Sequence, residues 1–464
     1  MIALIMPVYN TEKYLEEAIE SIINQTLSFK DNILLYLVDD ASTDGSFAIC
    51  EKYRDKFPDN IFVTHFNENH GASHARNMAI DFCRERDKSM TIGFVDSDDR
   101  LDSHALEEMV RFFEKYPDVN IAVAKFMYFE AREGDHKLNW RFDEREVVNI
   151  RKDYNYPQYY IGGCFFRGKA FENLSFDEGM IFWEDAMAVN KMILQEEKYG
   201  LVKNAVYEYR KRADESSMVD VSWQGKERYT TTYLDQGYLA LMKYCKKIKH
   251  RNLLYVQFLV AYHMRLIMMK SRDAKISEMF TEEELAELRK YVGKILRKIR
   301  VKVILQVPTS LPIIEAMLSM RAGKPVRTRR IYTGDDCIMV YRGVELARLS
   351  ERKVKLFHIV EDPESEFNGM WRGRFCTPAY SMRANDYIFA VHDGQRIDAV
   401  RHPCGIKVYV LGERIRNYYH AGFAIAIPED WKSARFGIHI AEADQDILLN
   451  EVVFDEVERV YFDS

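Results

Sequence analysis

The stretch MTIGFVDSDD, residues 90–99, places three carboxylates directly after a continuous apolar run. An apolar run of this kind is typical of a strand that is buried on both faces of a parallel sheet. Asp96, Asp98 and Asp99 follow where that strand should end, and like charges so close together repel unless something positive neutralises them. We therefore expect a parallel sheet with a cation at the end of this strand.

The first 130 residues alternate strand-like and helix-like periods around this stretch. Further strand-like runs lie at residues 2–8, 33–40, 61–66 and 120–129, and each is separated from the next by a segment with helical periodicity. Strictly alternating strands and helices predict an α/β fold with a doubly wound sheet and right-handed crossovers. Ligands of such sheets bind outside the carboxyl ends of the strands, and the polar clusters of this sequence lie there.

The chain divides by its patterns into three expected domains. Residues 1–222 form the α/β domain, and residues 223–330 read as long basic helices followed by a linker, because residues 307–330 contain three prolines and a basic end. Residues 331–464 consist of short alternating runs between Asp-Gly and Pro-containing turns. This last pattern predicts an antiparallel β-sandwich.

Composition and charge limit the class of protein. The chain has 464 residues, 47% of them hydrophobic, and seven cysteines without a CxxC pair. There is neither an uncharged apolar run of roughly 18 residues nor a signal-peptide pattern at the start, so we expect a soluble protein of the reducing cytoplasm. Residues 223–330 carry 23 Lys and Arg against 9 Asp and Glu, although the whole chain has a formal net charge of −6. This local excess indicates either an electrostatic match between domains of the chain or an anionic partner, such as a phosphate-rich acceptor or an anionic membrane surface. Nothing resembles a nucleic-acid-binding module.

Asp96 and Asp98 form a D-x-D pattern at the expected strand end. In an extended segment residues i and i+2 share a side, so both carboxylates can face one Mg²⁺ or Mn²⁺ ion, which prefers oxygen ligands together with substrate phosphates. The alternative is a solvated turn or a helix N-cap, because Asp is common at both.

Residues at the neighbouring strand ends add the features of a nucleotide site. Pro7 and Tyr9 end the first strand with an aromatic ring able to stack on a base, and Asp39 and Asp40 end the second with carboxylates able to accept hydrogen bonds. Arg76 begins a helix at the same edge, where a guanidinium can meet phosphate oxygens. The alternatives are a rim aromatic, a turn-forming Asp40 and a surface arginine.

Neither a P-loop nor a G-x-G-x-x-G motif follows the first strand. The charge of a bound diphosphate must then be met by a metal ion and by Arg or Lys side chains. This arrangement is the one expected for a nucleotide-diphosphate sugar donor.

Several motifs together resemble family 2 glycosyltransferases, which have the GT-A fold. They are PVYN (7–10), LVDDASTDGS (37–46), GASHARN (71–77), DSD (96–98) and WED (183–185), and they cover roughly residues 1–220. By this resemblance Tyr9, Asp39 and Asp40 hold a uracil-type base. Arg76 lies near the base or phosphates, Asp96 contacts ribose and Asp98 binds the metal. The family also implies inversion at the anomeric carbon.

The resemblance makes Asp185 the catalytic base. Direct displacement at an anomeric carbon needs a group that takes the proton of the acceptor hydroxyl, and a carboxylate within hydrogen-bond reach suffices. The alternative is a helix N-terminal charge favoured by the macrodipole. Trp183 and Glu184 are expected on the acceptor side, and Arg210 and Arg212 either assist the departing diphosphate or belong to a solvated edge strand.

The predicted function is metal-dependent, inverting transfer of a sugar from a UDP-sugar to a cell-surface polymer or its lipid-linked precursor. The basic middle and the β-sandwich resemble wall teichoic acid and capsule glycosyltransferases, whose extra domains mediate oligomerisation and bind anionic polymer. That likeness implies action at the inner face of the plasma membrane. Two alternatives are a nucleotidyltransferase, which would carry a Gly-rich, Lys-containing signature after the first strand, and a polysaccharide-binding protein with an inactive transferase-like domain.

Overall fold

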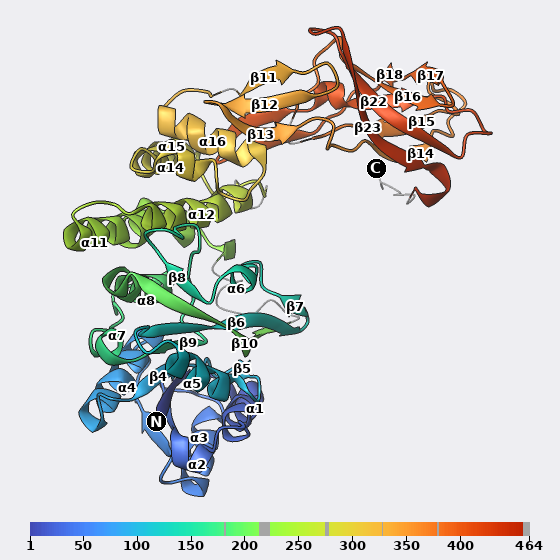
Figure 1. The fold of residues 1–464 in the computed structure, drawn as a ribbon. Helices are drawn as coiled ribbons and strands as arrows, with labels where there is room; N and C mark the ends of the chain where they lie inside the picture. The colour runs from blue at the N-terminus through green and yellow to red at the C-terminus, as the bar shows by residue number, and fades with distance from the viewer. Residues whose placement is uncertain (181, 213–222, 274–277, 327, 378–379, 458–464) are drawn as a thin grey trace. The chain divides into compact units, whose positions relative to one another are not determined.

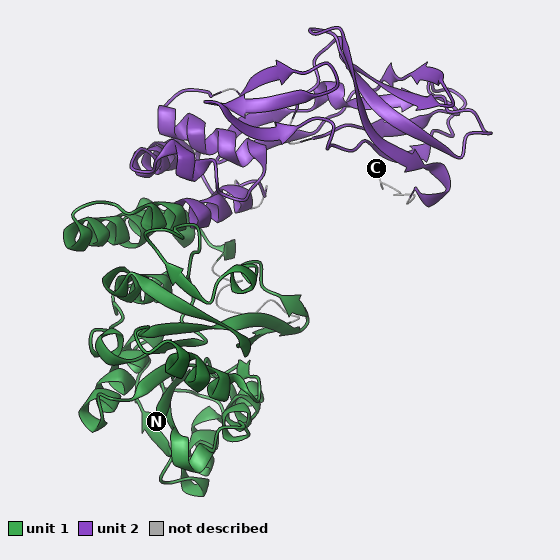
Figure 2. Cartoon of the chain, in the orientation of Figure 1, with its two compact units in different colours: residues 1–260 green, residues 261–464 purple. Residues whose placement is uncertain are grey.

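The computed structural model describes residues 1–180, 182–212, 223–273, 278–326, 328–377 and 380–457 (Figure 1). They form two compact units, residues 1–260 and 261–464 (Figure 2). The boundary expected between residues 222 and 223 lies inside the first unit. Residues 213–222, on one side of this boundary, are outside the described ranges. The division into three domains stays a prediction.

The first unit is built on one mixed sheet with the strand order β3-β2-β1-β4-β9-β6-β10-β5, to which β7 and β8 add at the side. Its strands are β1 (Ile2–Val8), β2 (Ile33–Asp39), β3 (Ile61–His65), β4 (Thr91–Phe94), β5 (Arg100–Leu101), β6 (Ile121–Glu130), β7 (Gly134–Asp135), β8 (Val147–Asn149), β9 (Cys164–Phe166) and β10 (Lys198–Lys211). The four strands β3, β2, β1 and β4 are parallel, as the alternating pattern predicts. The residues of β1, β2 and β4 are almost all buried, which explains their continuous apolar runs, whereas the edge strand β3 is mostly half-buried.

Beyond β4 the sheet is mixed. The short strand β9 lies between β4 and β6 and is antiparallel to both. Only three residues of the strand-like run 159–166 enter the ladder, so this strand carries little periodicity of its own. The predicted α/β fold class is nevertheless confirmed.

Helices cover the parallel strands at the intervals that the sequence predicts. They are α1 (Glu12–Ile23), α2 (Phe29–Asn32), α3 (Ser46–Lys56), α4 (Ala72–Arg86), α5 (Ala105–Lys115), α6 (Arg141–Glu144), α7 (Gly168–Glu172) and α8 (Glu184–Glu196). In α1 the buried residues Leu15, Ala18, Ile19 and Ile22 recur at helical spacing and pack into the sheet core. The chain continues with α10 (Thr231–Leu234), α11 (Ala240–Lys249) and α12 (Leu254–Lys270).

The second unit begins its own core with α14 (Glu282–Leu296), α15 (Val301–Ile304) and α16 (Leu311–Ala322). The prediction that residues 307–330 form a linker is wrong, because α16 occupies half of that range and residues 311–320 are all buried. Pro312 lies in the first turn of α16, where its missing N–H costs no helical hydrogen bond. Pro312 marks the start of a helix, but the sequence analysis interpreted it as part of a linker.

The remainder of the second unit consists of antiparallel sheets, which confirms the predicted class of this region. The strands are β11 (Arg329–Tyr332), β12 (Cys337–Tyr341), β13 (Val344–Arg348), β14 (Lys355–Ile359), β15 (Trp371–Arg374), β16 (Tyr387–His392), β17 (Gln395–Asp398), β18 (Val400–Arg401), β19 (Lys407–Val410), β20 (Glu413–Asn417), β21 (Gly422–Ile425), β22 (Ser433–Ile440) and β23 (Gln445–Val453). The sheets follow the orders β11-β12-β13, β14-β15-β21-β18, β17-β16-β22-β23 and β19-β20. Among the helices of the described ranges, none combines the length and the apolar character that a membrane crossing requires.

Candidate active site

The predicted site residues gather at the carboxyl ends of adjacent parallel strands. β1 pairs with β2 on one side and with β4 on the other, so the segments that follow these three strands share one edge of the sheet. The hydroxyl of Thr11 donates to Ser97 Oγ at 3.0 Å, which ties the segment after β1 to the segment after β4.

Arg76 joins two of the predicted site carboxylates. Its Nη1 donates to Asp185 Oδ1 at 2.9 Å and its Nη2 donates to Asp96 Oδ1 at 3.0 Å. The side chain is 6% exposed, and its guanidinium lies over the ring of Phe176. Burial alone would lower the pKa of Arg76, but Asp185 and Asp96 outweigh it and raise that pKa. Residues from α4, from the segment after β4 and from α8 thus form one charged unit, with the arginine in its centre.

Asp185 has the electrostatic surroundings of a proton acceptor. Burial is the largest influence and raises the pKa of its carboxyl; Arg76 lowers it, Glu184 and Asp96 raise it, and the result is about 7. The side chain retains 26% exposure, so one edge of the carboxyl is open. A base is most effective when its pKa lies near the working pH, which this environment achieves.

Two residues of β10 hold the segment Asp96–Asp99 in place through hydrogen bonds. The hydroxyl of Tyr207 accepts a hydrogen bond from Asp96 N at 3.1 Å and donates one to Asp99 Oδ2 at 2.7 Å. The backbone N–H of Arg210 donates to Asp99 Oδ1 at 2.8 Å, and its Nε donates to the carbonyl of Asp98 at 2.7 Å. Asp99 is 1% exposed, so it is an internal anchor, which the sequence analysis did not assign. Its burial, with Asp98 and Asp96 nearby, raises its pKa well above the ordinary range.

The position of Tyr207 explains a pair of glycines. A Cβ atom on Gly162 would lie 2.7 Å from the ring of Tyr207, and one on Gly163 would lie 2.9 Å from its Cβ. Gly163 also has a positive φ of 69°, which side chains disfavour. The glycines leave room for the Tyr207 ring beside the site.

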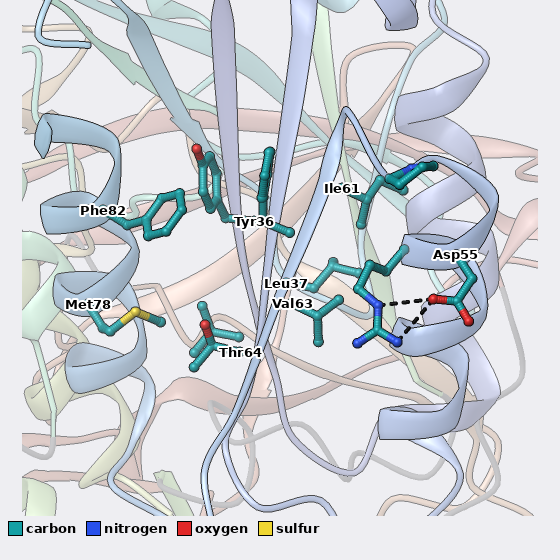
Figure 3. A pocket seen from close by; sticks show the side chains of 12 residues that line it. Tyr36, Leu37, Asp55, Ile61, Val63, Thr64, Met78 and Phe82 are labelled. Atoms are coloured by element: carbon teal, nitrogen blue, oxygen red, sulfur yellow. Dashed lines mark hydrogen bonds and ion pairs between the residues drawn. The ribbon is translucent and has the colours of Figure 1, made fainter. Parts of the chain in front are cut away.

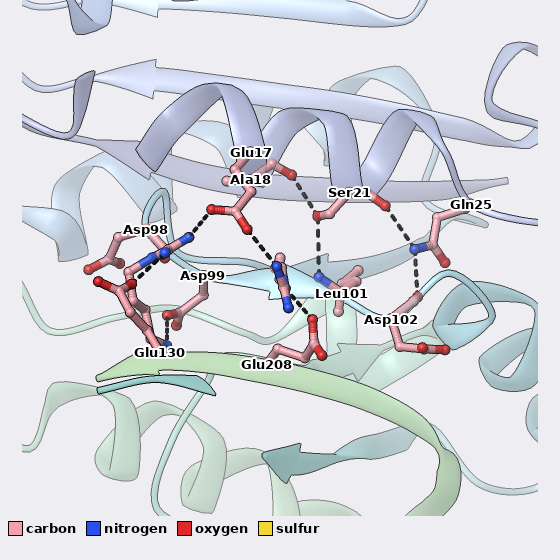
Figure 4. Close-up of polar contacts among 12 residues, drawn as sticks. Glu17, Ala18, Ser21, Gln25, Asp98, Asp99, Leu101, Asp102, Glu130 and Glu208 are labelled. Atoms are coloured by element: carbon pink, nitrogen blue, oxygen red, sulfur yellow. Dashed lines mark hydrogen bonds and ion pairs between the residues drawn. The ribbon is translucent and has the colours of Figure 1, made fainter. Parts of the chain in front are cut away.

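A carboxylate network fixes Arg210 of β10 (Figure 4). Arg210 Nη1 donates to Glu130 at 2.6 Å and Nη2 pairs with Glu17, while Arg100 bridges Glu17 and Glu208. The Arg210 side chain is 7% exposed and stacks on Tyr14 and Phe129. In this structure Arg210 therefore holds the segment in place, and its role toward the departing diphosphate stays a prediction.

Asp98 is the predicted metal ligand, and its carboxylate pairs with Arg212 in this structure. Burial and the neighbouring Asp96 raise its pKa, and the guanidinium of Arg212, which pairs with its Oδ2, opposes this effect. In the described ranges no three His, Cys, Asp or Glu side chains meet as a metal cage. One carboxylate is sufficient, however, where substrate phosphates and water supply the other ligands of Mg²⁺ or Mn²⁺. An acidic group whose charge is incompletely balanced fits such an ion.

The base-binding candidates adopt different environments. Tyr9 follows β1 and is 49% exposed, so its ring is available for stacking. Asp39 is fully buried; its Oδ2 lies 2.7 Å from His65 Nδ1, and its Oδ1 has no hydrogen-bond partner among the described residues. Asp40 accepts the backbone N–H groups of residues 70 and 71 on its two oxygens, at 2.8 and 2.7 Å, and so holds the turn that leads into α4. Pro7 lies within β1, opposite Val38.

Trp183 and Glu184 begin α8. Trp183 has a left-handed backbone at φ 68°, is 7% exposed and packs edge-on against Tyr238 at 5.0 Å. Its ring is therefore covered by protein, and contact with an acceptor sugar stays a prediction. Burial raises the pKa of Glu184, against the influence of Arg76 and Arg228. The turn at Trp183 places Glu184 and Asp185 in the first turn of the helix, where the macrodipole favours negative charge.

A separate cavity of about 320 Å³ lies at the outer edge of the sheet, around β2 and β3 (Figure 3). Met78 and Phe82 of α4 lie on one side of these strands and Asp55 of α3 lies on the other. None of the predicted site residues lines it. The cavity is distinct from the charged site.

The family model for glycosyl transferase family 2 matches residues 3–175. The minor teichoic acid biosynthesis protein GgaA of Bacillus subtilis is 34% identical over 436 residues, which covers 92% of each chain. The chain belongs to glycosyltransferase family 2. It is thus an enzyme of the hexosyltransferase type. The family membership that the motifs predicted is confirmed.

Two further proteins resemble the enzyme over most of its length. GgaB of Bacillus subtilis is 30% identical over 435 residues, which is 92% of this chain but only 46% of GgaB. The crystal structure of TarS from S. aureus matches 97% of this chain and 77% of its own with a TM-score of 0.56 and 16% identity. A structure of residues 1–349 of TarS with UDP-GlcNAc gives a TM-score of 0.53 at 19% identity, over 75% of this chain and 99% of that one. At these identities the likeness to TarS shows the fold.

Proposed function

We propose that the enzyme transfers a sugar from a UDP-sugar to a teichoic acid or related cell-surface polymer, with inversion of configuration and with Mn²⁺ or Mg²⁺. The observation that carries this proposal is the bridge from Asp96 through Arg76 to Asp185, because it joins the donor-side carboxylate to a base of suitable pKa. Donor recognition rests on Tyr9, Asp39 and Asp40, as the resemblance implies.

Asp185 accepts the proton of the acceptor hydroxyl as that oxygen attacks the anomeric carbon. At neutral pH a substantial share of its carboxyl is ionised, because its pKa is about 7. Arg76 fixes the orientation of this carboxylate through a hydrogen bond to Oδ1. When bound, the metal ion supplies positive charge to the departing diphosphate, and Asp98 would hold it.

The proposed acceptor rests on two facts. GgaA and GgaB, by their names, act in the biosynthesis of a minor teichoic acid, and the likeness to GgaA extends over both units of this chain. The excess of 23 basic over 9 acidic residues in positions 223–330 suits a phosphate-rich polymer. We further propose that the enzyme works in the cytoplasm at the inner face of the plasma membrane, on the polymer or its lipid-linked precursor, and that it self-associates.

A donor screen tests this function. Each common UDP-sugar is incubated with the enzyme, once with Mn²⁺ and once with a chelator, and release of UDP is measured with and without a polyol-phosphate acceptor. We expect turnover of one UDP-sugar that depends on the metal and is stimulated by the acceptor. Turnover that survives chelation would contradict the role of Asp98. Turnover of a nucleoside triphosphate would favour the nucleotidyltransferase, and binding of polysaccharide without any turnover would favour the inactive binding protein.

Loss of the Tyr207 hydroxyl is expected to loosen the metal-binding segment. In Tyr207→Phe the hydrogen bonds to Asp96 N and Asp99 Oδ2 disappear while the ring remains. Each lost bond to a buried group costs about 1–3 kcal/mol, so we expect the donor KM and the half-saturating Mn²⁺ concentration to rise about tenfold, with a smaller change in kcat. Tyr199→Phe removes another buried hydroxyl of the same strand, which donates to the carbonyl of Tyr156, and serves as the control. Equal effects of the two variants would show that Tyr207 acts only on stability.

The pH dependence of transfer should follow the pKa of Asp185. The base must be ionised, so kcat/KM falls as the pH drops through about 7. Glu184 raises the pKa of Asp185 and Arg76 lowers it, so Glu184→Gln should move this acid limb to lower pH and Arg76→Gln should move it to higher pH. Rate profiles of the two variants between pH 5 and 9 provide the measurement. Shifts in the same direction would contradict the assignment of the limb to Asp185.

A further inference from the structure

The second unit contains a pocket of about 400 Å³ whose charged lining is entirely basic. It lies over β14 and β15, and its walls include Arg372, Arg374, His358 and His402. Neither an aspartate nor a glutamate lines it. Its volume falls in the range of ordinary small-molecule sites.

The strand register places the basic residues in opposed pairs. Lys355 lies directly opposite Arg374, and His358 lies directly opposite Arg372, in the antiparallel ladder of β14 and β15. Gly373 faces the interior, because a Cβ there would lie 2.5 Å from the ring of Phe423, so the arginines on either side of it share the opposite face. Like charges directly opposite each other destabilise a sheet, and an anion between them would relieve that cost.

The protein itself does not balance these charges. Within the described part of the chain neither Arg372 nor Arg374 forms an ion pair with a carboxylate, and Arg374 instead lies over the ring of Phe357 at 4.7 Å. The pKa of His402 is lowered by burial and by Arg372, with the exposed Glu366 opposing weakly. Positive charge is thus crowded against the pocket.

A larger cavity in the same unit shows the contrast. It measures about 1050 Å³ and also contains arginines, three of which have acidic partners in its walls. Arg330 and Arg383 pair with Glu442, and Arg416 pairs with Glu315. In the smaller pocket neither Arg372 nor Arg374 has such a partner within the described ranges.

We propose that the pocket over β14 and β15 binds a phosphate-class oxyanion. Two guanidinium groups on one face suit the oxygens of a phosphate, to which arginine donates two parallel hydrogen bonds. The anion is either free phosphate or a phosphodiester of a polyol-phosphate chain. Only the second source rests on the proposed function, since the first requires no sugar transfer.

The test uses the full-length enzyme and binding measured by isothermal titration calorimetry at physiological ionic strength. The probes are inorganic phosphate, a polyol-phosphate oligomer and the neutral polyol. The double variant Arg372→Gln/Arg374→Gln removes the paired charges, and Arg435→Gln, an exposed arginine on β22 away from the pocket, is the matched control.

We expect saturable binding of phosphate that the double variant weakens by about tenfold or more and the control leaves unchanged, since hydrogen bonds to charged groups are strong. Without phosphate the double variant should melt at the same or a higher temperature than the wild type, and phosphate should raise Tm only in the wild type and the control. Tighter binding of the oligomer than of phosphate identifies the polymer as the source, and equal binding identifies free phosphate. Absence of saturable phosphate binding, or equal affinity in the wild type and the double variant, would overturn the proposal. Because these readouts need no turnover, they are independent of the donor screen.

Discussion

Asp185→Asn is expected to lower kcat for sugar transfer by about 10²–10⁴-fold, the contribution of a positioned general base. The amide keeps the shape of the side chain and can still accept a hydrogen bond from Arg76, but it cannot take a proton at neutral pH. The affinity for UDP should change little, because the proposed donor contacts lie on other residues. Initial rates with saturating donor and calorimetric titration of UDP measure the two quantities.

The control for this variant is Asp81→Asn. Asp81 lies on α4 like Arg76, but it is 68% exposed and pairs only with Arg84 at the surface. We expect it to retain the wild-type rate. If Asp185→Asn also kept that rate, or if it lost UDP binding in proportion to kcat, Asp185 would not be the base.

Asp98→Asn is expected to remove the response of the enzyme to Mn²⁺. A neutral amide is a poor partner for a hard divalent cation, and loss of electrostatic stabilisation at a departing diphosphate costs about 10²–10³-fold in kcat. The variant also releases Arg212 from its ion pair, so a part of the effect comes from that side chain. Rates measured over a range of Mn²⁺ concentrations separate the two contributions.

Arg212→Gln is the comparison that resolves Asp98→Asn. It breaks the same ion pair but leaves the carboxylate. We expect its rate to remain dependent on Mn²⁺, with half-saturation at or below the wild-type concentration. A titration curve for Asp98→Asn that coincides with the wild-type curve would exclude Asp98 as the ligand.

The sequence predicted the fold where the local pattern and the tertiary environment agree. Strands β1, β2 and β4 are buried on both faces, so their residues are almost all apolar, and the helices between the strands have one buried face. The strand-like run 159–166 does contain β9, but the pattern did not predict its antiparallel pairing with strands far away in the chain. It misled at α16, where Pro312 was read as part of a linker although it occupies the first turn of a buried helix.

The sequence allowed several residues of the site to be predicted, but not the contacts that they make with one another. The D-x-D pattern and the Glu184-Asp185 pair are visible in the sequence, but the bridge through Arg76 joins residues up to 109 positions apart. Asp99 was noticed among the crowded carboxylates, but its contact with the Tyr207 hydroxyl spans 108 positions and was not predicted. A tyrosine in an alternating strand carries no sign that its hydroxyl holds a loop on another strand.

The most direct test of the account is a ¹H NMR time course of sugar transfer to a polyol-phosphate acceptor in the presence of Mn²⁺. The donor is the α-linked UDP-sugar that the screen identifies. Direct displacement assisted by Asp185 at the anomeric carbon predicts that the first product is β-linked and that the signal fails to appear after chelation. An α-linked product, or transfer that continues without a divalent cation, would contradict the account.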